Sequence, residues 1–144
     1  MNAPSDPSFA QRCRESFGRQ QAMALIGARL AVVAPGYVEI ELPWRSDLTQ
    51  QKGYVHGGIL GMIADTACGY SAFSLMPAGA SIVTVEYKMN ILNPGRGSLV
   101  AKAKVVKPGR TLTIARAEVY ADDGKHVATM LQTLMMLADT PDTP

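Results

Sequence analysis

Cysteine and histidine are scarce in this sequence. Its 144 residues contain two of each, and the sequence contains neither a CxxC nor an HExxH motif. Two cysteines do not build a disulfide framework, and a protein metal site usually draws on several Cys, His or acidic ligands. Cys68 lies in an apolar stretch and is expected to be a small core residue. The sequence therefore predicts no metal site.

The chain also has little excess of one sign of charge over the other. The chain has 14 Lys and Arg residues against 12 Asp and Glu, a net charge of +2, and its basic residues are scattered. This balance argues against a general nucleic-acid binder, although small basic clusters suffice for one anionic ligand. Residues 1–10 lack the basic and then apolar segments of a secretory signal. We therefore expect a cytoplasmic protein with neither nucleic acid nor membrane as a partner.

One long apolar run is present. Residues 57–76 read GGILGMIADTACGYSAFSLM, which is about the length of a membrane span. Asp65 interrupts this run at its middle, many of its residues are small, and strand-like segments follow it. These features favour a helix that is buried on most sides within a protein core. Pro77 and Gly79 are expected to end it.

The other segments predict a second helix, a hairpin and further strands. Residues 8–24 have a helical period. Residues 1–7 and 138–144 are rich in Pro, Asp and Thr and are expected to be disordered tails. Alternating runs at 28–34 and 38–44 flank Pro35-Gly36 and predict the hairpin. Later strands are expected at 81–92, 98–107, 111–121 and 125–137.

Short turns between the late strands indicate antiparallel pairing. We expect an α+β fold in which a curved antiparallel sheet of about five to six strands wraps a long central helix, with an extra N-terminal helix and one domain over residues 1–144. An exposed sheet edge needs a partner, so self-association is expected. In the strand at 81–92, alternation puts these residues on two faces: Val83, Val85, Tyr87, Met89 and Ile91 against Thr84, Glu86, Lys88 and Asn90.

Asp65 is the main chemical anomaly. A buried carboxylate without a partner costs several kcal/mol, so an apolar helix rarely contains one without a use. One interpretation is a general base or a nucleophile. The other is a structural carboxylate that accepts hydrogen bonds from a nearby hydroxyl, such as that of Thr66, or from loop backbone. Composition leaves both interpretations open.

His56, Gly57 and Gly58 open the same helix. The first N–H groups of a helix have no internal acceptor and lie at the positive end of its dipole, so they suit an oxyanion. A simple glycine-rich helix start is the alternative. His56 alone is more typical of a structural loop histidine, and Gln50, in a polar loop, either orients water or a carbonyl or is solvated. Ser71 lies late in the helix, away from the strand-to-helix turn of a nucleophilic serine.

A short motif at these positions resembles the signature of the PaaI-like (phenylacetyl-CoA type) hotdog-fold acyl-CoA thioesterases. The order of elements agrees over residues 28–137, nearly the whole chain. The matching residues are Gly53-x-x-His56-Gly57-Gly58, then Asp65 eight residues after Gly57, and Gly69.

The resemblance implies a role for each matching position. Asp65 would be the nucleophile or the carboxylate that activates water, and the Gly57 N–H would be the oxyanion donor. Gln50 would hold the water or the thioester, and the Thr84 hydroxyl would assist the water. His56 and Gly58 complete the catalytic and substrate-binding groups at the helix start. Basic candidates for the coenzyme A phosphates are Arg96, Lys107 and Arg110.

The implied activity is hydrolysis of an aryl-acyl or medium-chain acyl-CoA, with coenzyme A as part of the substrate and no separate cofactor. Met62, Tyr70, Phe73 and Met89 are expected to line the acyl pocket. Two alternatives remain on the same fold. A dehydratase or hydratase would need a histidine base opposite a carboxylate, and His56 is already used at the helix start. A non-catalytic acyl-CoA sensor would normally add a DNA-binding segment, and the region before Ala28 is too short and not basic enough for a helix-turn-helix.

Assembly follows from the position of two residues on one helix. Gly57 and Asp65 lie eight residues apart, which is roughly 12 Å along a helix axis. A thioester carbonyl must sit about 3 Å from its oxyanion donor and within about 3.5 Å of the attacking group. Two antiparallel helices around a two-fold axis meet both requirements, whereas one helix does not. We therefore expect a homodimer with shared active sites, and the resemblance implies a homotetramer.

Overall fold

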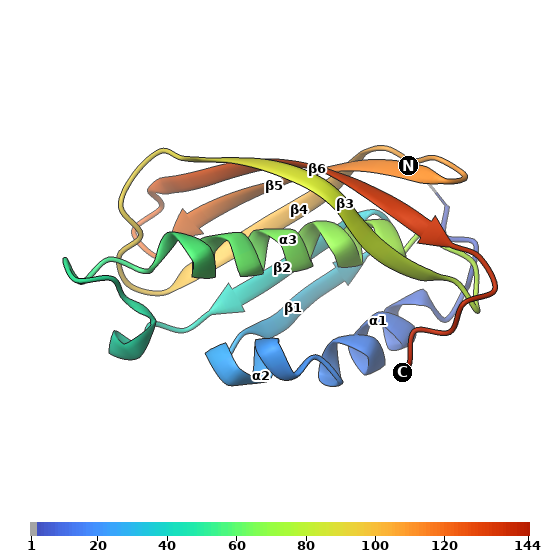
Figure 1. Cartoon of the computed structure of the whole chain (residues 1–144), viewed down its shortest axis with the longest axis horizontal. Helices are drawn as coiled ribbons and strands as arrows, with labels where there is room; N and C mark the ends of the chain where they lie inside the picture. The colour runs from blue at the N-terminus through green and yellow to red at the C-terminus, as the bar shows by residue number, and fades with distance from the viewer. Residues whose placement is uncertain (1–2) are drawn as a thin grey trace.

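The computed structural model describes residues 3–144, in which one antiparallel sheet curves around a long helix (Figure 1). The sheet has six strands in the order β1-β2-β4-β5-β6-β3, and every neighbouring pair is antiparallel. This arrangement confirms the expected α+β architecture. The strands are β1 (Arg29–Ala34), β2 (Tyr37–Leu42), β3 (Ser81–Ile91), β4 (Leu99–Lys107), β5 (Leu112–Ala121) and β6 (His126–Leu137).

The long helix α3 (Gly57–Phe73) lies along the concave face of the sheet, as its green ribbon shows in Figure 1. Alternate residues of β4 and β5 that face this helix are small and fully buried, which allows the helix to approach the sheet closely. The helix is therefore buried in the core, as its apolar sequence predicts. The small strand residues are Ala101, Ala103, Ala115 and Ala117.

The apolar helix is shorter than expected at its C-terminal end. It ends at Phe73 rather than at position 76. Ser74 follows, and its hydroxyl donates to the carbonyl of Ser71 and accepts a hydrogen bond from the N–H of Gly36. These bonds tie the helix end to the turn between β1 and β2. Among residues 3–144, no helix is long and apolar enough to cross a membrane.

The N-terminal helical segment is two helices and not the single helix expected at residues 8–24. Helix α1 (Phe9–Gly18) and helix α2 (Gln21–Ile26) are separated by a break at which Gln20 is extended. The break follows Gly18, and glycine is a weak helix former. Beyond it, Met23 and Ile26 join the core. Both helices lie on the β1 side of the molecule (Figure 1).

The expectation of disordered tails is wrong for most of the N-terminal segment. Positions 1–2 lie outside the described residues. Ser5 donates a hydrogen bond to the carbonyl of Leu75, 3.1 Å away. Asp6 is buried and forms an ion pair with Arg12 at 2.9 Å. The segment therefore lies against α1 and the end of α3.

The C-terminal segment is also attached to the body of the protein. The Asp142 carboxylate accepts a hydrogen bond from the Ser16 hydroxyl and forms an ion pair with Arg19 at 2.9 Å. A polar, proline-rich composition does not reveal such contacts because the partners lie far away in the sequence. The tail expectation at 138–144 is therefore wrong at Asp142.

Strand β3 departs from the alternation that its sequence predicts. Its pairing with β6 shifts register between Thr84 and Glu86, where one extra residue is inserted as a β-bulge. The bulge reverses the side-chain phase. Thr84 therefore points toward α3 and so do Tyr87 and Met89, which approach the helix at Gly61. The sequence-based assignment of Thr84 to the face opposite Tyr87 and Met89 is wrong for this reason.

One side of β3 has no neighbouring strand because β3 is at the edge of the sheet. Several large apolar side chains on this edge strand are about half exposed: Val83 at 41%, Val85 at 54%, Tyr87 at 49% and Ile91 at 52%. An unpaired edge with exposed apolar side chains is a template for another strand. Strand β3 therefore presents an unpaired edge with exposed apolar side chains.

Arg12 joins the N-terminal segment to the C-terminal end of α3. Its guanidinium donates to the backbone carbonyls of Phe73, Met76 and Pro77 at 3.3, 2.6 and 3.3 Å. It also lies 4.3 Å from the centre of the Phe73 ring. The last carbonyls of a helix lack internal donors, so a cation here satisfies them and interacts well with the helix dipole.

We predict that Arg12→Met lowers the free energy of unfolding by roughly 2 kcal/mol, because it leaves the Asp6 charge buried without its partner. Urea denaturation followed by circular dichroism measures the change. The matched control is Arg14→Met, since Arg14 is exposed and makes one hydrogen bond, to the carbonyl of Leu30. Equal stability of the Arg12 and Arg14 variants would contradict the prediction.

Candidate active site

The Asp65 carboxylate is held by donors from two strands. Its Oδ1 accepts a hydrogen bond from the Thr84 hydroxyl on β3 at 2.8 Å. The same oxygen accepts one from Nε2 of Gln132 on β6 at 2.5 Å. Within residues 3–144, no protein group donates to Oδ2. The carboxylate is therefore fixed through one oxygen, while the other is free to accept a proton or attack a carbon.

Asp65 is half-buried rather than enclosed in the core. It lines a cavity of about 200 Å³ with residues of α3, β3 and β6, and with residues of α1 and the C-terminal segment. The expected pocket residues Tyr70 and Phe73 do line it, whereas Met62 and Met89 do not. The remaining lining residues are Ser16, Gln20, Thr66, Gly69, Ile82, Thr84, Leu134 and Asp142.

Other potential nucleophiles near Asp65 are unsuited to reaction. Burial, with the Asp65 charge adding to it, raises the pKa of the Cys68 thiol, and a protonated thiol is a poor nucleophile. Ser71 is fully buried and its hydroxyl donates to the carbonyl of Cys68. Burial also raises the pKa of Tyr70 to about 12. Asp142, the other carboxylate that lines the cavity, is paired with Ser16 and Arg19. Asp65 is therefore the best placed of these groups to react.

Gly57 lies at the first turn of α3 and has an unoccupied N–H. Among the described residues, none accepts a hydrogen bond from this N–H. His56 is the N-cap, and its Nδ1 accepts from the N–H of Gly58 at 2.9 Å. Gly57 and Gln50 line one cavity of about 320 Å³. This geometry fits an oxyanion donor with an amide nearby, and it gives His56 a structural contact.

The two groups of predicted site residues lie in different places on one chain. Asp65 and Thr84 line the first cavity, Gln50 and Gly57 line the second, and no residue lines both. Both cavities border α3, on which Gly57 and Asp65 are roughly 12 Å apart along the axis. The two groups of predicted site residues are therefore separate on one chain, and we call their cavities the Asp65 cavity and the Gly57 cavity.

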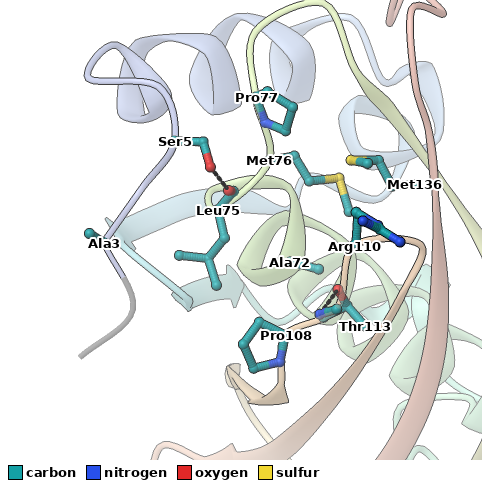
Figure 2. A pocket seen from close by; sticks show the side chains of 11 residues that line it. Ala3, Ser5, Ala72, Leu75, Met76, Pro77, Pro108, Arg110, Thr113 and Met136 are labelled. Carbon is teal, nitrogen blue, oxygen red and sulfur yellow. Dashed lines mark hydrogen bonds between the residues drawn. The ribbon is translucent and has the colours of Figure 1, made fainter.

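The three basic candidates are dispersed. Arg96 stacks over the ring of Tyr54 at 4.4 Å and donates to its hydroxyl at 3.0 Å, and Tyr54 lines the Gly57 cavity. Arg110 lines a third cavity of about 500 Å³, which Met76 and Met136 also line (Figure 2). Lys107 is exposed at the end of β4. Of the three, only Arg96 therefore lies beside either the Asp65 cavity or the Gly57 cavity.

Gln132 contacts Asp65 but was not among the residues selected from the sequence. It lies in the run 126–137, in phase with Met130 and Leu134, and each of the three is 1% exposed. A polar residue at a core position of a strand is the signal that identifies it, because buried polar groups need partners.

A single curved antiparallel sheet wrapped around one long helix defines a hotdog fold. The Escherichia coli PaaI protein from the phenylacetic acid degradation operon has the same fold. Its structure superposes with a TM-score of 0.85 and covers 92% of this chain and 96% of that one. The two sequences are 21% identical, so this likeness is one of fold.

The chain belongs to the thioesterase superfamily. Residues 52–128, more than half of it, match the model of that family. A thioesterase family protein from Silicibacter pomeroyi is 50% identical, with a TM-score of 0.88 over 90% of this chain and 98% of that one. A Halobacterium salinarum protein named as an esterase is 32% identical over 89 residues, 58% of this chain and 59% of that protein. The match thus spans about three fifths of that relative.

We predict that neither cysteine reacts with a thiol reagent in the folded protein at pH 8. Burial raises the pKa of Cys13 to about 11 and also raises that of Cys68, so both thiols stay protonated well above neutral pH, and the thiolate is the reactive form. Absorbance after addition of an aromatic disulfide reagent counts reactive thiols. Both should react in denaturant, and rapid reaction of either in the native protein would contradict the assigned burial.

Proposed function

We propose that this protein hydrolyses the thioester of an aryl-acyl or medium-chain acyl-CoA to the free acid and coenzyme A. The observation that carries the proposal is the Asp65 carboxylate. Two donors hold its Oδ1, its Oδ2 has no protein donor among residues 3–144, and its side chain borders a cavity. Membership of the thioesterase superfamily supports the same reaction.

Two routes for Asp65 are compatible with this geometry. As a general base, Oδ2 removes a proton from water, and the resulting hydroxide attacks the thioester carbonyl carbon. As a nucleophile, Oδ2 attacks that carbon itself, and water then hydrolyses the acyl anhydride. In both routes the carbon–sulfur bond breaks, the acid is released, and the coenzyme A thiolate takes up a proton. The reaction needs no separate cofactor.

The oxyanion that forms in either route would be stabilised at Gly57. Its N–H lies at the positive end of the α3 dipole and is not used within the described residues. Gln50 lines the same cavity and is suited to hold the thioester or the water. Arg96, beside that cavity, is the best placed of the three basic candidates for a coenzyme A phosphate.

We further propose that Asp65 of one subunit acts with Gly57 of the other. A homodimer formed around the exposed apolar edge of β3 would place the Asp65 cavity of each chain against the Gly57 cavity of the other. Two-fold symmetry then gives two complete sites. Pairing of such dimers would give the homotetramer that the resemblance implies. Each complete site would then contain residues of both chains.

Dehydration or hydration on the same fold is less favoured. That chemistry needs a histidine base opposite a carboxylate. Nδ1 of His56 already accepts the Gly58 N–H at the start of α3, and His126, the other histidine, contacts Glu118 on the sheet. Binding of acyl-CoA without turnover is the remaining alternative, and the next experiment separates it from hydrolysis.

We predict that Asp65→Asn lowers kcat on acyl-CoA by at least ~100-fold, because the variant lacks the base or nucleophile but keeps the shape of the side chain. Release of free thiol from a panel of aryl-acyl and medium-chain acyl-CoA substrates measures turnover. The matched control is Asp123→Asn in the exposed β5–β6 turn, which should retain full activity. Wild-type rates in a folded Asp65→Asn variant would exclude the assignment. A wild-type protein that binds acyl-CoA but does not hydrolyse it would be a non-catalytic binding protein.

A mixing experiment tests the shared site. Asp65→Asn and Gly57→Val should each be inactive alone, because each damages both sites of its homodimer. A Cβ at Gly57 would meet Cδ1 of Ile91 at 3.0 Å, and a branched side chain crowds the N–H further. A heterodimer of the two variants contains one undamaged site, so it should recover half of the wild-type rate.

Differently tagged chains allow the heterodimer to be purified after denaturation and refolding of the mixture. A refolded wild-type mixture is the control for losses. A heterodimer that forms and stays inactive, or a fully active wild-type monomer, would contradict the shared site.

A further inference from the structure

Gln132 is a buried polar side chain whose amide has only half of its hydrogen-bonding capacity in use. It is 1% exposed. Its Nε2 donates to Asp65 Oδ1 at 2.5 Å and to Thr84 Oγ1 at 2.8 Å. Its Oε1 is inaccessible to solvent and has no partner among the described residues. A buried acceptor without a donor costs free energy, so another group must impose this arrangement.

The orientation of the amide follows from Asp65. An ionised carboxylate accepts hydrogen bonds and donates none, so the NH₂ group must face it. The reversed amide would place Oε1 against Oδ1 at the 2.5 Å now occupied by a donor–acceptor pair. Oε1 of Gln132 is therefore left without a partner because Nε2 is turned toward Asp65 and Thr84.

The same amide sets the direction of the Thr84 hydroxyl. Thr84 Oγ1 accepts a hydrogen bond from Gln132, and it donates its one proton to Asp65 Oδ1 at 2.8 Å. The Gln132 amide, the Thr84 hydroxyl and the Asp65 carboxylate are thus hydrogen-bonded to one another, and Oδ1 of Asp65 is the shared acceptor. Thr84 has no second proton to donate to a water molecule, so its remaining lone pair can only accept a hydrogen bond from one.

We infer that Gln132 is a positioning residue, which fixes Oδ1 of Asp65 directly and through Thr84 so that Oδ2 is presented to the substrate. The inference rests on the proposed function, since Asp65 is the catalytic group through which Gln132 acts. It also gives Thr84 a further role, because its hydroxyl orients the carboxylate. Gln132 itself does not touch the substrate.

The first test replaces Gln132 with methionine, which has a similar length and no hydrogen-bonding amide. We expect Gln132→Met to lower kcat at least ~10-fold with KM within about twofold, because a misoriented base or nucleophile loses rate rather than binding. The melting temperature should stay the same or rise, because the substitution removes an unpartnered buried oxygen. A structural role predicts the opposite pattern, with a lower melting temperature and an unchanged kcat.

The matched control is Thr133→Val. Thr133 is the next residue of β6, and its hydroxyl donates to Glu86 on the opposite face of the sheet at 3.0 Å. This variant loses one hydrogen bond to a carboxylate without touching Asp65. Its kcat should remain within about twofold of wild type.

A second variant keeps the inference testable if Gln132→Met does not fold. Gln132→Glu would place a second carboxyl against Asp65, and two adjacent carboxylates do not both ionise readily. The acidic limb of the kcat–pH profile should move upward by at least about one pH unit. The other titratable groups that border this cavity, Tyr70 and Asp142, are unchanged and serve as the common background.

The outcomes separate the inference from the proposed function. If the wild-type protein turns over acyl-CoA, an unchanged kcat in Gln132→Met overturns the role of Gln132 alone. An unchanged kcat–pH profile in an active Gln132→Glu variant does the same. Wild-type protein without turnover on the acyl-CoA panel overturns the proposed function, and the role of Gln132 with it. Both are supported if the wild-type protein turns over acyl-CoA and the Gln132→Met variant has a low kcat with an unchanged KM and an unchanged melting temperature.

Discussion

The hydrogen bonds to Oδ1 of Asp65 are the constraint on which the surrounding structure depends. The carboxylate lies in an otherwise apolar helix, where loss of hydration is costly without donors. Thr84 on β3 and Gln132 on β6 supply those donors, so one oxygen atom joins three elements. The bulge after Thr84 and the buried amide of Gln132 both depart from regular apolar packing. The placement of the Gln132 amide is accounted for by the need to hold this carboxylate, whereas the bulge turns Tyr87 and Met89 toward α3.

The main elements of the fold could be predicted because each has a clear period and ends at a turn. The apolar run became α3, and each alternating run became a strand near its expected bounds. Two features had no local signal. The β3 bulge arises from pairing with β6, and Asp142 is held by residues more than a hundred positions away. Pairing and long-range contacts decide these features, and neither appears in a local pattern.

The candidate site was partly predictable for a related reason. A short motif identified Asp65 and Gly57, but their roles came from resemblance, and the chain keeps them in separate cavities. Gln132 lies about seventy residues after Asp65 and belongs to no motif. Its only signal was a polar residue at a buried strand position. The structure therefore adds the contacts that fix the carboxylate.

The central claim is that a thioester binds between Asp65 of one subunit and Gly57 of the other. The most direct measurement is a crystal structure of the Asp65→Asn variant with an acyl-CoA that it binds and turns over slowly. The account predicts a carbonyl oxygen about 3 Å from the Gly57 nitrogen, with the carbonyl carbon facing position 65 of the partner subunit. A thioester held by Gly57 and position 65 of the same chain, or bound instead in the cavity beside Arg110, would contradict it.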